Sequence, residues 1–394
     1  MTGKEMEKHH NILLPLSWIY GTAVRLRNAL FDAGILKSQS FATPIISVGN
    51  ITVGGTGKTP HVEYLVRLLK DRLHVAVLSR GYKRKSHGFL LATPTSTVSD
   101  LGDEPYQIKQ KFPDISVAVD KKRTRGIERL TKDKDSETTV DVILLDDAFQ
   151  HRYVKPGLNI LLTDYHRLII NDKLLPAGRL REPVKSKERA NIVIVTKCPT
   201  TLTPMDFRVL THQLGLFPYQ RLYFTTLVYD PIHPLFPTEG KESQTLDSQN
   251  VLLLTGIAAP QQLVNDLRPQ VGTLHPLCFG DHHRFRKKDI RRINNALEAI
   301  PHPRLIVTTE KDATRLADAE GLSSEARCSL YVLPVRVSFM QDGEQAFAEQ
   351  ITGYINKNSR KSILLRDKKD QKADDERQSD HQPVIISFKN NNSV

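Results

Sequence analysis

The fold of this chain is decided by the stretch Pro44-Ile45-Ile46-Ser47-Val48-Gly49-Asn50-Ile51-Thr52-Val53-Gly54-Gly55-Thr56-Gly57-Lys58-Thr59-Pro60. The stretch begins with a short apolar run, which is typical of a buried strand, and then becomes rich in glycine. It ends in a Lys-Thr pair, and from Pro60 onward apolar residues recur at the spacing of an amphipathic helix. A strand, a glycine-rich loop and a helix in this order predict a phosphate-binding loop.

Each part of this loop has a chemical reason. Glycines allow backbone N–H groups to close around phosphate oxygens, and the start of a helix adds unpaired donors and a positive dipole end. We expect Lys58 to reach the terminal phosphates of a nucleotide and the Thr59 hydroxyl to bind Mg²⁺. The predicted nucleotide contacts are Thr52, Val53, Gly54, Gly55, Thr56, Gly57, Lys58 and Thr59. The strict pattern has glycine where this chain has Thr52, so the loop is a variant, and the alternative is a glycine-rich turn without a ligand.

A second acidic motif completes the expected site. Asp146 and Asp147 follow a continuous apolar run at 142–145, as expected of a buried parallel strand with acidic residues at its end. In phosphate-loop enzymes, one such carboxylate binds Mg²⁺ directly or through water. The alternative is a plain turn. Near the base-binding position, Pro199 stands where guanine-specific GTPases have aspartate, so the sequence argues against guanine recognition.

Composition narrows the class of protein. The chain has 394 residues, enough for two domains, and a net charge of +12, which indicates an anionic partner. Anionic lipid and phosphorylated substrates both fit, whereas no nucleic-acid-reading motif is present and no protein partner is predicted. The three cysteines lack metal-ligand spacing, which indicates a reducing compartment. Neither a signal-peptide pattern nor a transmembrane span is visible.

The first 36 residues predict an amphipathic helix that contains the only tryptophan of the chain. The predicted apolar face consists of Leu16, Ile19, Tyr20, Ala23, Leu26 and Leu30, and the predicted polar face of Ser17, Gly21, Arg25 and Asn28. Such a helix can lie in a membrane surface. It can equally pack on the first domain as an amphipathic helix, and periodicity leaves both possibilities open.

The remaining pattern predicts an α/β protein with two domains. Residues 37–220 form the phosphate-loop domain, with a mostly parallel sheet, and residues 221–356 form a second α/β domain. Two β runs, at 221–229 and 330–337, are expected to pair as a bridge between the domains. Residues 357–394 are rich in Lys, Asp, Gln and Asn, which predicts disorder.

Taken together, the motifs resemble the tetraacyldisaccharide 4'-kinase (lipid A 4'-kinase) family over roughly residues 11–350. The motifs that carry the resemblance are Ser47-Val48-Gly49-Asn50 to Thr59-Pro60, Ser79-Arg80-Gly81-Tyr82, Gly102-Asp103-Glu104-Pro105, Asp146-Asp147-Ala148-Phe149-Gln150-His151, Leu180-Arg181-Glu182-Pro183, Asp281-His282-His283-Arg284-Phe285 and Thr309-Glu310-Lys311-Asp312-Ala313. The resemblance does not extend to the polar tail.

The resemblance implies ATP-dependent phosphorylation of the 4'-hydroxyl of a tetraacylated glucosamine disaccharide 1-phosphate, forming a lipid A precursor. It implies two α/β/α domains joined by a two-stranded bridge. It also implies an N-terminal helix on the cytoplasmic face of the bacterial inner membrane, where the protein is peripheral. This implication favours the membrane alternative for the first 36 residues.

The acceptor hydroxyl needs a base or an orienting group. Asp103 is the candidate, and the resemblance implies that His282 from the second domain pairs with it, so that Asp103, His282 and Lys58 form the predicted catalytic set. The alternatives for His282 are a surface histidine or half of a metal pair with His283. The second-rank candidates are Glu104 for the metal, and Gln150, Arg181 and Glu182 for the nucleotide or the sugar.

Two other classes of protein share parts of this pattern. Membrane-associated ATP switches related to the partition and cofactor-insertion ATPases have similar loops, but they carry lysine where this chain has Val53. A non-enzymatic membrane-docking protein would have no use for Asp103, Asp146 and Asp147 together.

Overall fold

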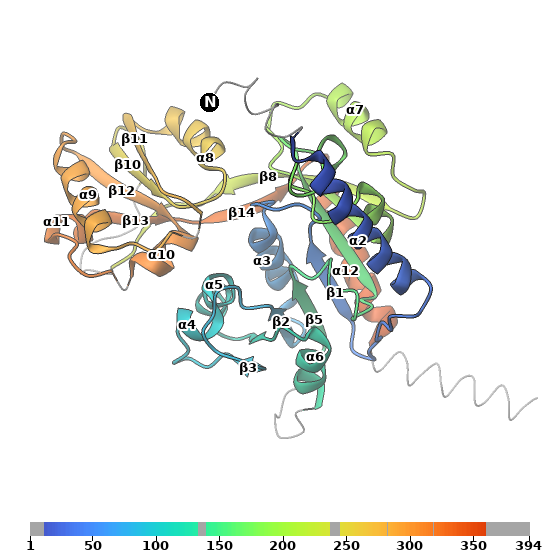
Figure 1. Ribbon diagram of the computed structural model, residues 1–394. Helices are drawn as coiled ribbons and strands as arrows, with labels where there is room; N and C mark the ends of the chain where they lie inside the picture. The colour runs from blue at the N-terminus through green and yellow to red at the C-terminus, as the bar shows by residue number, and fades with distance from the viewer. Residues whose placement is uncertain (1–11, 133–138, 237–244, 282, 318, 360–394) are drawn as a thin grey trace, which may run out of the picture.

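Two mostly parallel mixed sheets build the protein, one of nine strands and one of five in the part of the chain that the structure describes (Figure 1). The computed structural model describes residues 12–132, 139–236, 245–281, 283–317 and 319–359. His282 and the predicted tail beyond residue 359 therefore lie outside the described residues.

The large sheet has the phosphate-loop strand near its centre. Its strands in spatial order are β14 (Val335–Phe339), β8 (Arg221–Tyr229), β7 (Ile192–Thr196), β6 (Leu158–Asp164), β1 (Ile45–Gly49), β5 (Val142–Asp146), β2 (Val75–Ser79), β4 (Ser116–Val119) and β3 (Leu90–Leu91). Among the described strands of this large sheet, only the β14–β8 and β3–β4 pairs are antiparallel. Because β5 lies directly beside β1 in parallel, with Val48 opposite Asp146, the loops that follow the two strands emerge side by side.

Helices cover both sheets. The large sheet and the helices packed on it form the first unit. Up to residue 214, its helices and short 3-10 turns are α2 (Leu14–Asp32), α3 (Lys58–Leu69), α4 (Val98–Leu101), α5 (Asp103–Lys111), α6 (Arg123–Lys132), α7 (Pro204–Leu214), η1 (Ile169–Asn171) and η2 (Val184–Arg189). The predicted helix after Pro60 is α3, which buries Val62, Val66 and Leu69 against the large sheet. This packing fixes the start of α3 at the carboxyl end of β1.

The small sheet and its own helices form the second unit. Its strands in spatial order are β11 (Thr273–Cys278), β10 (Asn250–Thr255), β12 (Arg304–Thr309), β13 (Leu330–Leu333) and β9 (His233–Pro234). The associated helices are α8 (Pro260–Leu267), η3 (Arg268–Gln270), α9 (Lys287–Glu298), α10 (Glu310–Leu316) and α11 (Ser324–Cys328).

The connection between the sheets differs from the sequence prediction. The single strand expected at 330–337 is two strands: β13 belongs to the small sheet, and β14 pairs antiparallel with β8 in the large sheet. Pro334 separates the two strands, and proline cannot donate to a strand ladder. Figure 1 shows β8 and β14 running together between the sheets.

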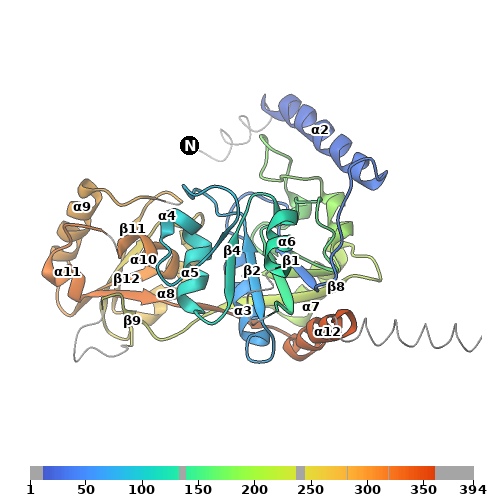
Figure 2. The same cartoon turned by 90° about the horizontal axis from the view of Figure 1, so that it is seen from below.

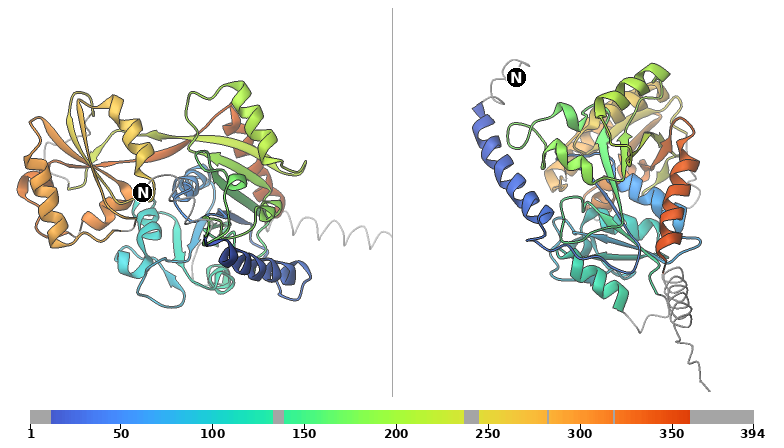
Figure 3. Two further views of the ribbon diagram at one scale, coloured as in Figure 1. Left: turned by 45° about the horizontal axis from the view of Figure 1, so that its top comes forward. Right: turned by 90° about the vertical axis from the view of Figure 1, so that its right-hand side faces the viewer.

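The last described helix, α12 (Gly343–Asn358), also departs from the predicted boundaries. It was expected within the second domain at 221–356, but its buried residues Phe347, Ile351 and Ile355 belong to the core of the large sheet. The chain thus returns to the first unit after β13. In the right-hand view of Figure 3, α12 and α2 lie on opposite sides of the molecule.

Helix α2 packs on the first unit, as one of the two alternatives expected, and its buried residues are Ser17, Gly21 and Phe31. The Ser17 hydroxyl donates to the Leu174 carbonyl at 3.1 Å and accepts from the Ala177 N–H at 2.9 Å, and Gly21 is buried beside it. The exposed apolar side chains are Leu16 (53% exposed), Trp18 (76%), Ile19 (69%) and Leu26 (62%). Figure 2 shows α2 at the outside of the molecule. No helix in the described ranges is long and apolar enough to cross a membrane.

Candidate active site

The glycine-rich loop runs from the end of β1 to the start of α3. Two of its residues, Gly54 (φ +116°) and Gly57 (φ +78°), have backbone angles that side-chain-bearing residues rarely adopt. A neighbouring segment supports the start of the loop, because the Val53 N–H donates to the Arg179 carbonyl at 2.8 Å and the Arg181 N–H donates to the Ile51 carbonyl at 2.7 Å. The residue types at 54 and 57 are therefore a requirement of the backbone.

Asn50 braces the loop from inside, a role that the sequence did not reveal. Its buried amide donates to the hydroxyls of Thr56 at 2.7 Å and Thr52 at 3.3 Å. Both threonine side chains consequently point into the protein and are less than a tenth exposed. Thr52 and Thr56 can offer a ligand backbone groups, while Val53 is exposed at the rim.

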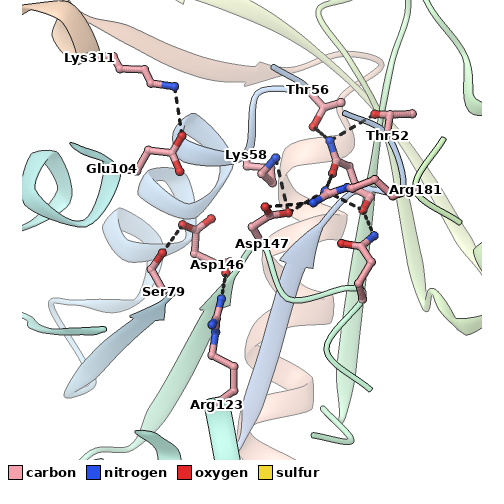
Figure 4. Close-up of polar contacts among 12 residues, drawn as sticks. Thr52, Thr56, Lys58, Ser79, Glu104, Arg123, Asp146, Asp147, Arg181 and Lys311 are labelled. Carbon is pink, nitrogen blue, oxygen red and sulfur yellow. Dashed lines mark hydrogen bonds and ion pairs between the residues drawn. The ribbon is translucent and has the colours of Figure 1, made fainter. Parts of the chain in front are cut away.

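Lys58 and Asp147 meet across the two central loops, as Figure 4 shows. The Lys58 Nζ lies 3.6 Å from the Asp147 Oδ1, and the Arg181 Nη2 lies 3.0 Å from the same oxygen. Arg181 also donates to the side chain of Asn50, and the Gln150 amide donates to the Asn50 carbonyl at 2.5 Å. The structure thus brings together Lys58, Asp147, Arg181 and Gln150, all predicted as site residues.

Asp146 lies beside this cluster in a different environment. Its Oδ2 accepts a hydrogen bond from the Ser79 hydroxyl at 3.1 Å, and its Oδ1 is buried without a hydrogen-bond partner among the described residues. Burial, together with the neighbouring carboxylates of Glu104 and Asp147, raises the pKa of Asp146 to about 7. A buried carboxylate oxygen with no donor is suited to receive a cation.

Helix α10 of the second unit meets the start of α5 at the edge of this site. Asp103 and Glu104 are the first two residues of α5, and each faces a cation from α10. The Arg315 Nη2 lies 2.6 Å from the Asp103 Oδ2, and the Lys311 Nζ lies 3.3 Å from the Glu104 Oε1. The expected pairing of Asp103 with His282 stays a prediction, because His282 lies outside the described residues.

Two other predicted site residues, Thr59 and Glu182, have environments of their own. Thr59 is the second residue of α3 and is half-buried. Glu182, expected to contact the nucleotide or the sugar, is only 1% exposed and forms an ion pair with Arg189 at 2.5 Å. The geometry of Glu182 therefore argues for a structural role in the loop that carries Arg181.

Two residues outside the predicted set hold the loop from the other side. His61 is buried, and its ring nitrogens contact the Gly57 carbonyl (2.7 Å) and the Thr225 hydroxyl (3.1 Å). Burial lowers the pKa of His61 to about 4, so its ring is neutral at physiological pH. Lys197 donates to the Gly55 carbonyl and to the Asp164 carboxylate at 2.8 Å. His61 could have been found from its spacing, since it lies one helical turn after Gly57.

The comparisons with known proteins agree with this geometry. Residues 9–356 match the family model described as tetraacyldisaccharide-1-P 4'-kinase. Tetraacyldisaccharide 4'-kinases from Phocaeicola vulgatus and Bacteroides thetaiotaomicron are 56% and 50% identical to the chain, covering 89% and 90% of it and 96% of each relative. A crystal structure described as the "apo" form of LpxK from Aquifex aeolicus in complex with ATP is similar, with a TM-score of 0.66 and 28% identity, over 88% of this chain and 99% of that one. The chain therefore belongs to the tetraacyldisaccharide-1-P 4'-kinase family.

Proposed function

We propose that this protein transfers the γ-phosphoryl group of ATP to the 4'-hydroxyl of a tetraacylated glucosamine disaccharide 1-phosphate, a step of lipid A biosynthesis. The observation that carries the proposal is the meeting of Lys58 and Asp147 at 3.6 Å, where the central loops of the large sheet converge, in a chain of this kinase family. A glycine-rich loop after β1 and two aspartates after the adjacent β5 match the arrangement of phosphate-loop NTPases.

Positioning and charge neutralisation dominate phosphoryl transfer. The N–H groups of the loop and of the first turn of α3 would hold the phosphates, and Lys58 would neutralise their charge. In the described structure, Lys58 and Arg181 are occupied by Asp147. ATP phosphates would compete for both cations, and the triphosphate would then lie between Lys58 and the aspartates.

Mg²⁺ fits the oxygen atoms of this site. The Asp146 Oδ1, which has no hydrogen-bond partner among the described residues, is a ligand of the kind that Mg²⁺ prefers. Within the described ranges, no group of three or more His, Cys, Asp or Glu side chains could hold a metal alone. Mg²⁺ typically takes one or two carboxylates and completes its shell with phosphates and water. Asp146 is the proposed direct ligand, Thr59, Asp147 and Glu104 are the further candidates, and bound Mg²⁺ would supply positive charge to the β- and γ-phosphates.

Asp103 is the proposed group that orients the acceptor hydroxyl and accepts its proton. Its position at the start of α5, next to Glu104, puts it on the side of the site that faces the second unit. The proton would pass from the sugar hydroxyl to an Asp103 carboxylate oxygen as the sugar oxygen attacks the γ-phosphorus, and the bond from that phosphorus to the β–γ bridging oxygen would break to release ADP. His282 would assist by pairing with Asp103.

The acyl chains of such an acceptor require access to a membrane, and α2 offers a surface for it. Its outward apolar side chains, Trp18 among them, would insert at the interface of the cytoplasmic leaflet of the inner membrane. The net charge of +12 adds attraction to anionic lipid. The proposed association is peripheral.

The test is to incubate the purified protein with γ-labelled ATP and detergent-solubilised tetraacyldisaccharide 1-phosphate. We expect the label in the lipid, with the new phosphate at the 4' position by mass spectrometry and NMR. Label recovered only as inorganic phosphate, with or without lipid, would instead identify an ATPase switch. Intact ATP would identify a docking protein, and either result overturns the proposal.

A further inference from the structure

We propose that Arg315 is a positioning residue for phosphoryl transfer, because it fixes the Asp103 carboxylate from the opposite unit of the protein. The inference rests on the proposed function, in which Asp103 orients the acceptor hydroxyl and takes its proton. It adds a residue of the second unit whose contribution is the direction of that carboxylate.

The contact between the two side chains is directional. The Arg315 Nη2 donates to the Asp103 Oδ2 at 2.6 Å, and the Arg315 Nε donates to the same oxygen at 3.1 Å. The side chains are only 7% and 17% exposed, respectively, so water screens the pair weakly. The two donors belong to one rigid guanidinium plane and both bind Oδ2. They therefore fix the rotation of the carboxylate and the direction in which its Oδ1 points.

Arg315 is itself anchored on a buried acid. Its Nη1 donates to the Asp312 Oδ1 at 3.1 Å, and Asp312 is fully buried. The Asp312 Oδ2 accepts from the Gly256 N–H and from the Thr309 hydroxyl, both at 2.8 Å. The guanidinium is therefore held between Asp312 and Asp103, and a lysine could not reproduce its fixed set of donors.

The backbone of Asp103 is fixed independently of this ion pair. Gly102, immediately before it, has φ +87°, and a Cβ at Gly102 would lie 2.7 Å from the Tyr82 carbonyl oxygen. The position of Asp103 thus comes from the first unit, and the direction of its carboxylate comes from the second. One helical turn before Arg315, Lys311 makes the corresponding contact with Glu104.

Arg315 and the phosphate loop are held by separate contacts, and this separation predicts which kinetic constant changes. Arg315 contacts Asp103, whereas the phosphate loop is held by Asn50, His61 and Lys197. Loss of Arg315 should therefore leave ATP binding unchanged and lower kcat, because a misdirected carboxylate no longer aligns the acceptor. A misplacement of about 1 Å can lower a rate by about 100-fold.

The first experiment compares Arg315→Gln with Glu310→Gln in the full-length protein. Glu310 is a matched control, since it lies on the same helix and pairs across the same boundary with Lys111, rather than Asp103, at 2.5 Å. We expect Arg315→Gln to lower kcat about 10- to 100-fold with KM for ATP within about twofold of wild type. Glu310→Gln should keep kcat within about twofold. Equal kcat in the two variants would overturn the inference.

Arg315→Lys keeps a cation at the boundary and serves as the second variant if the Gln variant does not fold. Its kcat should lie between those of wild type and Arg315→Gln. If Arg315→Gln does not fold, the kcat of Arg315→Lys should still lie well below that of wild type. A wild-type kcat for Arg315→Lys would show that charge alone suffices and would overturn the positioning role.

The second experiment asks whether Arg315 acts through Asp103. In the Asp103→Asn background, Arg315→Gln should lower kcat by less than about twofold more, because residues that act as a unit are not additive. If Arg315→Gln lowers kcat in that background by the same factor as in the wild-type protein, the inference is contradicted. The proposed function fails by a different result: wild-type protein that phosphorylates no lipid, or Asp103→Asn that keeps the wild-type rate.

Discussion

Asp146 and Asp147 are neighbours in sequence, yet the site shifts their pKa values in opposite directions. Burial and nearby carboxylates raise the pKa of Asp146 to about 7. Burial also acts to raise the pKa of Asp147, but Lys58 and Arg181 outweigh it and lower that pKa to about 2. One carboxylate is therefore satisfied by cations of the protein, while the other is suited to a cation that arrives with the nucleotide.

Replacing Asp146 by Asn should stabilise the protein while abolishing transfer. The raised pKa of Asp146 means that its ionised form is disfavoured in the fold, so this group weakens stability as pH rises from about 4 to about 7. Without nucleotide and metal, Asp146→Asn should raise Tm by roughly 5 °C at pH 8, and less at pH 5. Differential scanning fluorimetry measures this, with the exposed Asp71→Asn as control. A lower Tm at pH 8 would contradict the electrostatic description.

His61 should make the first unit sensitive to acid. Its pKa of about 4 in the fold lies below the usual value of 6.5, so its stabilising contribution is complete above pH 6.5 and is lost as pH falls toward 4. Between pH 7.5 and 5, His61 alone should account for about 2 kcal/mol of lost stability. In urea denaturation, His61→Asn should show a smaller pH dependence than wild type, whereas the exposed His212→Asn should match wild type. Identical pH dependence in all three proteins would exclude this role.

Asn50 should matter to ATP binding although it offers no side chain to the ligand. Asn50→Ala would leave the buried hydroxyls of Thr52 and Thr56 without their shared donor, a loss of about 1–3 kcal/mol. We expect a loosened loop and a KM for ATP raised about 10-fold or more. Steady-state kinetics with varied ATP test this. An unchanged KM would show that the loop keeps its shape without the brace.

The single tryptophan reports directly on the proposed membrane contact. Trp18 is 76% exposed on α2, so its fluorescence should shift to shorter wavelength when anionic phospholipid vesicles are added. Ile19→Glu should weaken vesicle binding about 10-fold or more without changing Tm, because the side chain at position 19 is exposed. Met205→Glu, at an exposed apolar residue on α7, should bind as wild type does. Equal loss of binding in both variants would contradict a contact through α2.

The local parts of the site could be predicted from the sequence because their signals are local. The strand at 45–49, the glycine loop and α3 follow one another within 30 residues, and the acidic pair ends an apolar run. The helix α2 could also be predicted from its apolar periodicity. Which side packs on the protein could not, because it depends on small residues, Ser17 and Gly21, fitting against a distant loop.

The long-range parts could not be predicted in this way. The ion pair of Asp103 and Arg315 joins residues 212 positions apart, and no periodicity encodes it. The return of α12 to the large sheet depends on a hydrophobic core shared with α3. In contrast, Pro334 indicates in the sequence that 330–337 divides into two strands. The apolar residues on both sides of Pro334 nevertheless favour the prediction of a single strand.

The most direct test of the account is the single-turnover rate of Lys58→Ala with saturating ATP and lipid acceptor. In the proposed mechanism the triphosphate binds between Lys58 and the two aspartates, so removing the lysine should lower phosphoryl transfer by about 1000-fold or more, with the fold intact by circular dichroism. A transfer rate close to that of wild type would contradict the phosphate-binding loop itself.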